Sequence, residues 1–348
     1  MNWEQHIIPS SASIKEALVN LDKLGQDALL FIHNSAFELV GSLTDGDIRR
    51  GLLAGFTIDS SVEQIAQKKP RYIRENEKSV HKLIEFRERN LKIIPVLAAD
   101  SDRIIDVINF RIKHSLLPVD AVIMAGGEGQ RLRPLTEKTP KPLLKVGDKP
   151  IIEHTIDRLA FYGLKNMWLS VNYLANQMEE FVSDKISDIS IQIVKESIPL
   201  GTIGSITLID SFYNDYILLC NSDLLTNVDF EAFFLDFETS NADLSVVTIP
   251  YNVDIPYAVL EVENGKISDF KEKPTYTYYS NGGIYLIKRE MLQFIPKNEV
   301  FSATDFMSKL IEQKRNVRSY PHHGYWLDIG KHEDYKKAQE DIINLNLY

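Results

Sequence analysis

The chain has 348 residues, of which 44% are apolar and 25% are charged, a balance typical of a globular protein with one or two domains. No uninterrupted apolar run approaches the ~18 residues that a membrane-spanning helix needs, and the N-terminus lacks the pattern of a secretory signal. We therefore expect a cytoplasmic protein without a membrane partner. The single cysteine, Cys220, allows no internal disulfide and fits a reducing compartment.

The charge is distributed unevenly along the chain. Residues 1–118 contain 16 basic and 16 acidic side chains, whereas residues 119–348 contain 23 and 33 and so carry the whole net charge of −10. Phosphate backbones of nucleic acids attract basic surfaces, so we expect no nucleic-acid partner. Local basic clusters in the second part are expected to bind small phosphates instead.

Residues 1–117 contain a weak internal repeat, in which residues 28–52 correspond to residues 92–116. Each copy is expected to fold as helix, strand, polar turn, strand and helix. The first helices, at 13–24 and 79–89, begin at serines that can cap them. Two such units, at about 1–60 and 61–117, could pack as a pair around one core.

This part resembles a tandem cystathionine-β-synthase (CBS) module. In that family a Thr or Ser after the second strand, and an Asp three residues later, hold the ribose of an adenosine ligand. The first copy matches with Thr44 and Asp47, but the second has Asn109, Arg111 and Ile112 in this region. The resemblance implies at most one adenine-nucleotide site, and a homodimer, because paired CBS modules commonly dimerise. The alternative is a purely structural module in which Asp47 caps the next helix.

Residues 119–348 alternate strands with helices. We expect strands at 121–125, 166–171, 189–195, 216–220, 244–251, 258–262 and 283–287, and helices at 151–162, 177–184, 202–210, 230–239 and 302–313. This alternation predicts an α/β fold with a Rossmann-like, mixed but mainly parallel sheet flanked by helices. Ligands of such sheets bind at the carboxyl ends of the strands.

A glycine-rich turn follows the first of these strands and reads Gly126-Gly-Glu-Gly129, with Arg131 two residues later. Glycines permit a positive φ and a close approach of backbone amides to an anion, and arginine offers a planar fork of donors to phosphate. It is not a Walker A loop, because no Gly-Lys-Ser/Thr occurs in the chain, nor a dinucleotide fingerprint, because Leu132 replaces the third glycine. The sequence predicts a different phosphate loop.

This loop, continued by Pro140-Lys-Pro-Leu-Leu144, closely resembles the signature of the sugar-1-phosphate nucleotidylyltransferases. Within that family the pattern looks most like the mannose-1-phosphate guanylyltransferases. The resemblance implies a GT-A-type fold and the transfer of a nucleoside monophosphate from an NTP, with GTP favoured, to a hexose or hexosamine 1-phosphate. An NDP-sugar and pyrophosphate would result. The arrangement of a CBS pair followed by such a catalytic domain is similar to that of nucleotidyltransferases in bacterial surface-glycan pathways.

Both reactants of such a transfer are anions, so the site must neutralise and align charge. The matching family positions imply that Arg131 contacts the departing β and γ phosphates and that Lys141 stabilises charge at the α-phosphate. Asp223 follows the strand 216–220, and Asp328 lies in Trp326-Leu-Asp-Ile-Gly330. The resemblance makes both aspartates ligands of Mg²⁺, which prefers oxygen donors.

The resemblance also implies where each substrate binds. The nucleotide would contact the loop at Ala125, Gly126, Gly127 and Gly129. It would also contact the segment that begins at Glu196, where Gly201 lets the backbone approach the base and Thr202 caps the next helix. The sugar phosphate would contact Glu272 and Lys273 of a Glu-Lys-Pro triplet, and Asn281 and Gly283 of the segment Asn281-Gly-Gly-Ile-Tyr285.

Two other functions compete with this interpretation. A glycosyltransferase that consumes a nucleotide sugar could use Asn221-Ser-Asp223 as its metal motif, but it would not need Arg131 and Lys141 around a triphosphate. A non-catalytic nucleotide-sensing protein would have lost some of the catalytic positions, whereas every expected position is filled.

Overall fold

The structure is a computed structural model that describes residues 3–183, 189–345 and 347. The chain divides into unit 1, Met1–Leu117 with Phe161–Gly163, and unit 2, Pro118–Ala160 with Leu164–Tyr348. Position 184, the end of one expected helix, lies outside the described residues. None of the described helices is long and apolar enough to cross a bilayer.

Unit 1 contains two three-stranded sheets of the same topology, in the orders β1-β2-β3 and β4-β5-β6. In each sheet the first two strands pair in parallel and the last two antiparallel. The elements are β1 (Ile7–Pro9), α1 (Ile14–Leu24), β2 (Leu30–His33), β3 (Leu39–Leu43), α2 (Asp45–Leu53), β4 (Ile73–Arg74), α3 (Val80–Glu88), β5 (Ile93–Leu97) and β6 (Ile104–Asn109). The repeat in the sequence is therefore a repeat in the fold.

Helices α1 and α3 begin where the sequence predicts, because the side chains of Ser13 and Ser79 accept hydrogen bonds from the backbone N–H three residues on. The second copy nevertheless lacks its expected last helix. After β6 the Asn109 Oδ1 accepts from the N–H of Arg111 at 3.0 Å, and no helix forms between residues 110 and 118. An asparagine side chain that bonds to the nearby backbone competes with helix formation.

Each copy of unit 1 has an apolar core of its own, and a further cluster is shared between the two copies. One core lies around Leu30 and Ile48 and the other around Leu83 and Val96. A smaller cluster that contains Phe31 from the first copy and residues of β5 and β6 joins them. The two copies are thus packed separately and contact each other through this smaller apolar cluster.

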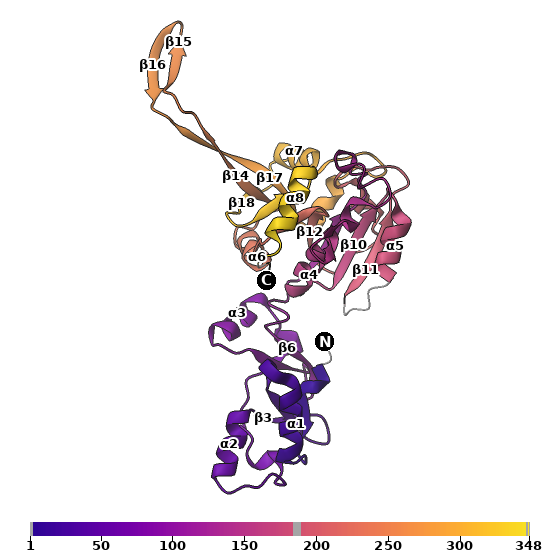
Figure 1. Ribbon diagram of the computed structural model, residues 1–348, viewed down its shortest axis with the longest axis vertical. Coiled ribbons are helices and arrows are strands. Elements are labelled where there is room, and N and C mark those ends of the chain that lie inside the picture. Colours follow the sequence, from indigo (N-terminus) through magenta and orange to yellow (C-terminus); the bar gives the residue numbers. More distant parts are fainter. Residues whose placement is uncertain (1–2, 184–188, 346, 348) are drawn as a thin grey trace. The chain divides into compact units, whose positions relative to one another are not determined.

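Unit 2 is built on a seven-stranded sheet of order β11-β10-β7-β12-β17-β14-β18, in which only β17 runs against its neighbours. Helices flank this sheet (Figure 1). The elements are β7 (Val119–Met124), β8 (Lys145–Val146), β9 (Lys149–Pro150), α4 (Ile151–Phe161), β10 (Asn166–Val171), α5 (Ala175–Ser183), β11 (Ser190–Lys195), β12 (Tyr216–Asn221), β13 (Leu224–Thr226), α6 (Phe230–Thr239), β14 (Leu244–Asp254), β15 (Val259–Glu263), β16 (Lys266–Lys271), β17 (Thr275–Lys288), α7 (Ala303–Glu312), β18 (Val317–Pro321), β19 (Trp326–Asp328) and α8 (His332–Asp341). The predicted mixed, mainly parallel sheet is confirmed.

Some expected elements of unit 2 differ in the structure. The helix expected at 202–210 is a short 3₁₀ turn, Gly204–Leu208. The strands β8, β9, β13, β16, β18 and β19 and the helix α8 were not predicted. β8, β9, β13 and β19 have only two or three residues each, and α8 is mostly polar. Cys220 is a buried core residue, and burial raises the pKa of its thiol to about 12.

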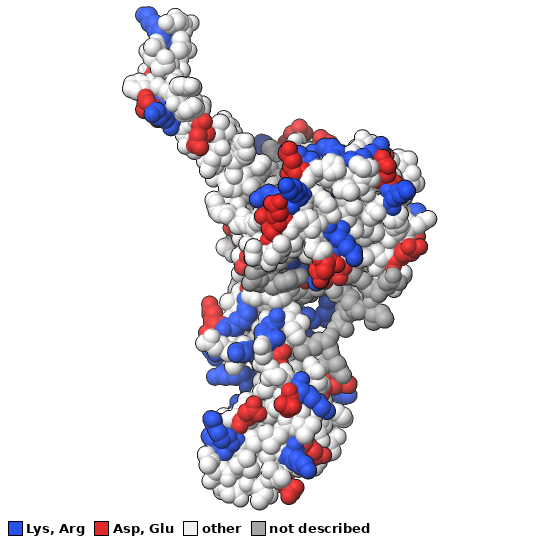
Figure 2. All heavy atoms as spheres, in the orientation of Figure 1, with Lys and Arg blue, Asp and Glu red and all other residues white. Residues whose placement is uncertain are grey.

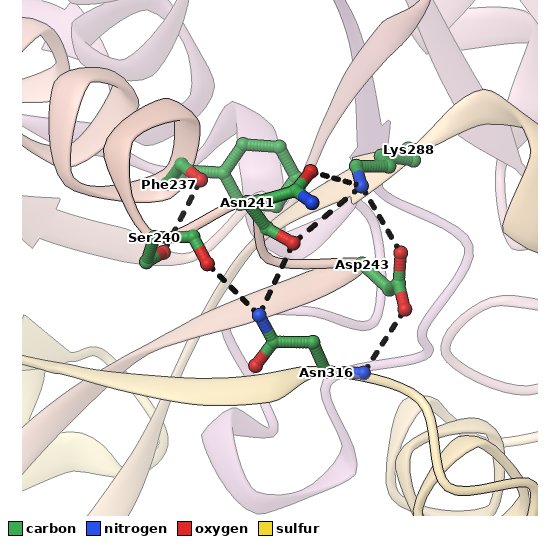
Figure 3. Close-up of polar contacts among 6 residues, drawn as sticks. All are labelled: Phe237, Ser240, Asn241, Asp243, Lys288 and Asn316. Carbon is green, nitrogen blue, oxygen red and sulfur yellow. Dashed lines mark hydrogen bonds and ion pairs between the residues drawn. The ribbon is translucent and has the colours of Figure 1, made fainter.

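A polar network holds the sheet at the end opposite the glycine-rich turn (Figure 3). Lys288 Nζ at the end of β17 donates to Asn241 Oδ1 at 2.8 Å and to Asp243 Oδ1 at 3.2 Å. The main-chain N–H of Asn316 donates to Asp243 Oδ2 at 2.9 Å, and its side-chain amide donates to the carbonyl of Ser240 at 2.9 Å. The end of α6, the starts of β14 and β18 and the end of β17 are therefore fixed together.

The strands β14 and β17 continue beyond the sheet as a two-stranded ribbon that carries the hairpin β15–β16 (Figure 1). We call residues 250–280 the arm. The first five residues of β14 are buried and its last four are exposed. The other strand of the ribbon, β17, shows the reverse order. The arm therefore leaves the body of unit 2 where burial ends.

We predict that Asp120→Ala destabilises unit 2 by about 3 kcal/mol, because it leaves buried donors unpaired. The carboxylate of Asp120 is fully buried and accepts from the backbone N–H groups of Tyr213 at 2.6 Å and Asn214 at 2.9 Å. Urea unfolding monitored by fluorescence measures the loss. The exposed Asp210, changed to Ala, is the control and should shift stability by less than about 0.5 kcal/mol; equal effects would contradict the argument.

Candidate active site

The glycine-rich turn follows β7, and its three glycines serve different purposes. Gly129 has φ +62°, and a Cβ there would lie 3.0 Å from Thr136 Cγ2 and 3.1 Å from Lys141 Cβ. A Cβ on Gly127 would meet nothing within 4 Å. Positive φ, expected for the turn in general, occurs only at Gly129. Gly127 faces open space, so the backbone there is accessible to a ligand.

Gly126 is in close contact with Glu196, which follows β11. A Cβ on Gly126 would lie only 2.9 Å from Glu196 Oε1. The carboxylate of Glu196 is buried and accepts from Ser170 Oγ at 2.5 Å and from the N–H of Leu200 at 2.8 Å. Glu196 therefore fixes the turn 196–200 directly beside the glycine loop, as expected for segments at the carboxyl ends of parallel strands in one sheet.

The next two residues of this segment lie against the start of α7. Gly201 has φ +81°, and a Cβ there would lie 2.5 Å from the carbonyl oxygen of Phe301. Thr202 does not cap the turn that follows it, contrary to expectation, because its hydroxyl accepts from the N–H of Ala303 at 2.8 Å. The expected helix is a 3₁₀ turn whose preceding residue, Ile203, makes no side-chain cap.

Lys141 forms an ion pair with Asp223. The lysine lies in a 3₁₀ turn, Lys141–Leu143, that begins after Pro140, and the aspartate follows β12. Their side chains are 11% and 21% exposed, so the pair is largely removed from water and its mutual attraction is only weakly screened. The main-chain conformation that proline imposes helps to hold the lysine in place.

Asp328 lies next to Asp223 because β13 and β19 pair antiparallel, with Leu224 opposite Asp328. The N–H of Ile329 also donates to the carbonyl of Asp223 at 3.0 Å. Burial raises the pKa of Asp328, and the neighbouring negative charge of Asp223 raises it further. The nearby cations Lys141 and Arg131 lower it in part.

The two carboxylates suit a divalent cation. Asp223 Oδ1 and Asp328 Oδ1 are buried, and neither has a hydrogen-bond partner among the described residues. Buried, unpaired carboxylate oxygens are costly unless an ion or proton compensates them. Within the described ranges, no three His, Cys, Asp or Glu side chains group as metal ligands. Mg²⁺ usually takes one or two carboxylates and completes its octahedral shell with waters and substrate phosphates, so this donor set fits it.

A cavity of about 530 Å³ unites these groups. Its lining comprises Met124, Gly126, Gly127, Gly129, Gln130, Arg131, Lys141, Pro142, Glu196, Pro199, Gly201, Thr202, Asn221, Ser222, Asp223 and Gly330. The structure thus brings together most of the residues that the sequence analysis assigned to catalysis and to the nucleotide. Asp328 is two residues from Gly330, and Ala125 is buried between Met124 and Gly126. Sequence reasoning did not assign Asn221, Ser222 or Gly330, although all three belong to motifs that it quoted.

Of the four residues assigned to the sugar phosphate, one lies against the cavity wall and the others do not line the cavity. Gly283 has φ +71°, and a Cβ there would lie 2.7 Å from the side-chain nitrogen of Asn221 in the cavity wall. Asn281 is exposed, and its side chain donates to the hydroxyl of Tyr285 at 2.6 Å. Glu272 and Lys273 are exposed residues of the arm and do not line the cavity.

Close packing requires a glycine at position 282, because any side chain would be a poor fit there. A Cβ on Gly282 would lie 2.7 Å from the carbonyl oxygen of Val247, and the Gly282 carbonyl accepts from the indole N–H of Trp326 at 2.9 Å. This glycine lies in the register shift between β14 and β17.

The fold and the site define an α/β protein in which a glycine loop and two basic side chains, Arg131 and Lys141, lie beside a pair of carboxylates. The nucleotidyl transferase family profile matches residues 120–344. The chain belongs to this family.

Relatives and solved structures extend this finding. A mannose-1-phosphate guanylyltransferase of Mycobacterium tuberculosis is 31% identical over 65% of this chain and 65% of its own length. A D-glycero-α-D-manno-heptose 1-phosphate guanylyltransferase of Aneurinibacillus thermoaerophilus is 29% identical over 64% of this chain and 98% of its own. The chain thus spans just under two thirds of the length of the mannose-1-phosphate relatives. A crystal structure of a proposed glucose-1-phosphate thymidylyltransferase from Bacillus anthracis has 23% identity and TM-score 0.53 over 66% of this chain and 96% of its own, and shows the shared fold.

We predict that Asp328→Asn stabilises the protein at pH 7 when no divalent cation is present. Because the native pKa of Asp328 lies above its ordinary value of 3.8, the native state binds the proton more tightly than the unfolded state does. The stability contributed by Asp328 is therefore lost as pH rises through the raised pKa. Asparagine removes this charge. Urea unfolding in EDTA should show the gain at pH 7 and a diminishing gain as pH falls towards 3.8.

Asp210→Asn is the matched control, because Asp210 is exposed, and it should show no such pH-dependent gain. An Asp328→Asn protein that is less stable than the parent at pH 7 would contradict the assignment of Asp328 as an uncompensated buried charge.

Proposed function

We propose that unit 2 transfers a nucleoside monophosphate from an NTP, with GTP favoured, to a hexose or hexosamine 1-phosphate. The observation that carries the proposal is the single cavity in which the glycine loop, Lys141 and Asp223 meet. The glycine loop and Lys141 can contact phosphate oxygens, and Asp223 can hold a cation beside them, so the cavity suits a triphosphate. The guanylyltransferase names of the relatives, at about 30% identity, favour guanine and a sugar of the mannose type.

The reaction exchanges one phosphoanhydride bond for another. A phosphate oxygen of the sugar 1-phosphate attacks the α-phosphorus of the NTP, and the bond from that phosphorus to the oxygen of the leaving pyrophosphate breaks. No proton must move, so the side chains act by position and charge. Exposed Arg131 would contact the β and γ phosphates, and Lys141 would stabilise the negative charge that gathers on the α-phosphoryl oxygens.

Asp223 and Asp328 would hold Mg²⁺ beside the triphosphate. A divalent cation supplies charge neutralisation and orientation at the phosphates. The ion pair with Asp223 holds the Lys141 ammonium beside the two carboxylates. In this position the lysine would face the α-phosphate of a bound nucleotide. The turn 196–202, fixed by the carboxylate of Glu196, would form the wall against the base.

We predict that purified protein with Mg²⁺ releases pyrophosphate only when one NTP and one sugar 1-phosphate are both present. The assay covers GTP, CTP, UTP, dTTP and ATP, each against a panel of hexose and hexosamine 1-phosphates. Lys141→Ala and Asp223→Asn should each lower kcat by at least about 10³, because each removes charge stabilisation at the reacting phosphate.

Lys145→Ala and Asp210→Asn are the controls, since both side chains are exposed outside the cavity, and their rates should match the parent. Full activity in Asp223→Asn, or no release with any pair of substrates, would contradict the proposal.

We further propose that unit 1 is a CBS-type module in which Thr44 and Asp47 bind an adenine nucleotide and so regulate unit 2. The two residues lie together at the start of α2. Asp47 Oδ2 accepts from Thr44 Oγ1 at 2.6 Å and from the Thr44 N–H at 2.9 Å, and Asp47 Oδ1 pairs with Arg50 at 2.6 Å. A ribose would have to compete for these oxygens, so the capping role remains the alternative.

We predict, on this proposal, that calorimetry detects binding of AMP, ADP, ATP or S-adenosylmethionine to the full chain and that Asp47→Ala abolishes it. Asp47→Ala also breaks a capping box, so the control is Glu16→Ala, which breaks the equivalent box of α1 through the bonds of Glu16 Oε2 to Ser13. Binding that survives in Glu16→Ala and disappears in Asp47→Ala supports the site. Absence of any Asp47-dependent binding returns Asp47 to its capping role.

A further inference from the structure

The arm is exposed along its whole length. None of the residues 250–280 is buried, although they include nine large apolar side chains that are more than a third exposed. Most of the arm's surface that Figure 2 shows is neither basic nor acidic. An exposed apolar surface of this kind marks an interaction site.

The outer part of the stem, residues 251–254 and 275–278, has one apolar and one polar face, whereas the pair Pro250–Tyr279 on the polar side lies nearer the sheet. Tyr251 pairs with Tyr278 and Val253 pairs with Tyr276, so these four side chains lie on one face of the ribbon. Tyr251 is 64% exposed and Tyr278 61%. The opposite face is polar and bonded within itself, because Thr275 donates to Asp254 at 2.6 Å and Thr277 to Asn252 at 2.9 Å.

The tip repeats this division. Leu260 pairs with Phe270 and Val262 with Ile267 across β15 and β16, which places the four on one face, and each is at least half exposed. The other face is charged and includes the ion pair of Glu261 with Lys271 at 3.2 Å. A two-stranded ribbon with an uncovered apolar face is marginally stable in water, so the arm needs a surface to pack on.

The triplet Glu272-Lys273-Pro274 lies between the tip and the stem, and both charged residues are exposed. Among the described residues, the basic side chains that line the cavity are Arg131 and Lys141, and Lys141 already pairs with Asp223. A sugar 1-phosphate is a second dianion, so its binding beside a triphosphate requires a further cation. Lys273 is suited to this position, but on its own chain it lies outside the cavity.

The arm is poorly placed to close over its own cavity. Its stem is one uninterrupted ladder from the pair Thr248–Asn281 to the pair Asp254–Thr275, continuous with the central sheet. Folding the arm back would break this ladder and its bonded polar face. Docking on another molecule requires no such break, and reciprocal exchange of identical elements closes with twofold symmetry.

We infer that the arm of one copy docks by its apolar face on unit 2 of a second copy and brings Glu272 and Lys273 to the sugar-phosphate side of that copy's cavity. Each active site is then formed by two chains. Lys273 neutralises the incoming phosphate, and Glu272 accepts hydrogen bonds from sugar hydroxyls. The inference rests on the proposed function, because it names the group that completes the same site.

Complementation between two inactive variants tests the inference. Lys141→Ala has a damaged cavity and an intact arm, and Lys273→Ala has the reverse. The two chains carry different affinity tags, are co-expressed, and are purified through both tags. In an exchanged dimer the intact cavity receives the intact arm, so the heterodimer recovers about half of the parent rate although each homodimer is inactive. No recovery, no doubly tagged dimer, or full activity of the Lys273→Ala homodimer overturns the inference.

A second measurement is independent of activity. A tagged chain in which Phe270 is replaced by photoreactive p-benzoylphenylalanine is co-expressed with an untagged chain and irradiated. We expect a covalent two-chain product whose crosslinked peptides lie around the cavity of the other chain. The same probe at Asp269, on the charged face of the arm, should give far less of it.

Crosslinks within one chain only, or none, overturn the exchange. Interchain crosslinks in a protein that releases no pyrophosphate would instead leave the exchange standing and reject the proposed function.

Discussion

The site depends on three charged groups that are held together out of water: Lys141, Asp223 and Asp328. Two carboxylates side by side repel each other, and the raised pKa of Asp328 expresses this repulsion together with burial. One lysine compensates one of them, and two buried oxygens remain without partners. Such an arrangement persists only because the surrounding sheet fixes it, and it favours the binding of a cation.

The parts of this site that the sequence predicts are those with a local cause. A buried strand followed by glycines predicts a turn that brings backbone amides to an anion, and Gly129 does adopt positive φ. Glu196 and Asp223 each follow a strand of the same parallel sheet, so their meeting at one edge follows from topology alone. Prediction of the fold class succeeded for the same reason, since apolar periodicity and helix caps are short-range signals.

The parts that the sequence did not reveal depend on contacts between distant segments. β13 and β19 have three residues each and are separated by about a hundred residues, so no periodicity indicates the pairing that sets Asp328 beside Asp223, and only the resemblance to a known family joined the two aspartates. Gly282 is required by the carbonyl of Val247, which only the register of β14 with β17 brings near. Thr202 bonds to Ala303 rather than to its own turn for a similar reason. Tertiary packing decided each of these positions.

The arm combines a local sequence pattern with a packing contact that the pattern does not specify. Its alternation of apolar and polar residues is typical of strands with one buried face, although the sequence analysis predicted neither β16 nor the part of β17 that lies in the arm. The burial that the same pattern demands is not provided by the chain itself, since no residue of 250–280 is buried. A sequence that codes for a buried face at Leu260, Val262 and Phe270 is consistent with a fold in which that face is covered. A second copy supplies a cover of constant shape, and the same contact would deliver a further cation to the cavity.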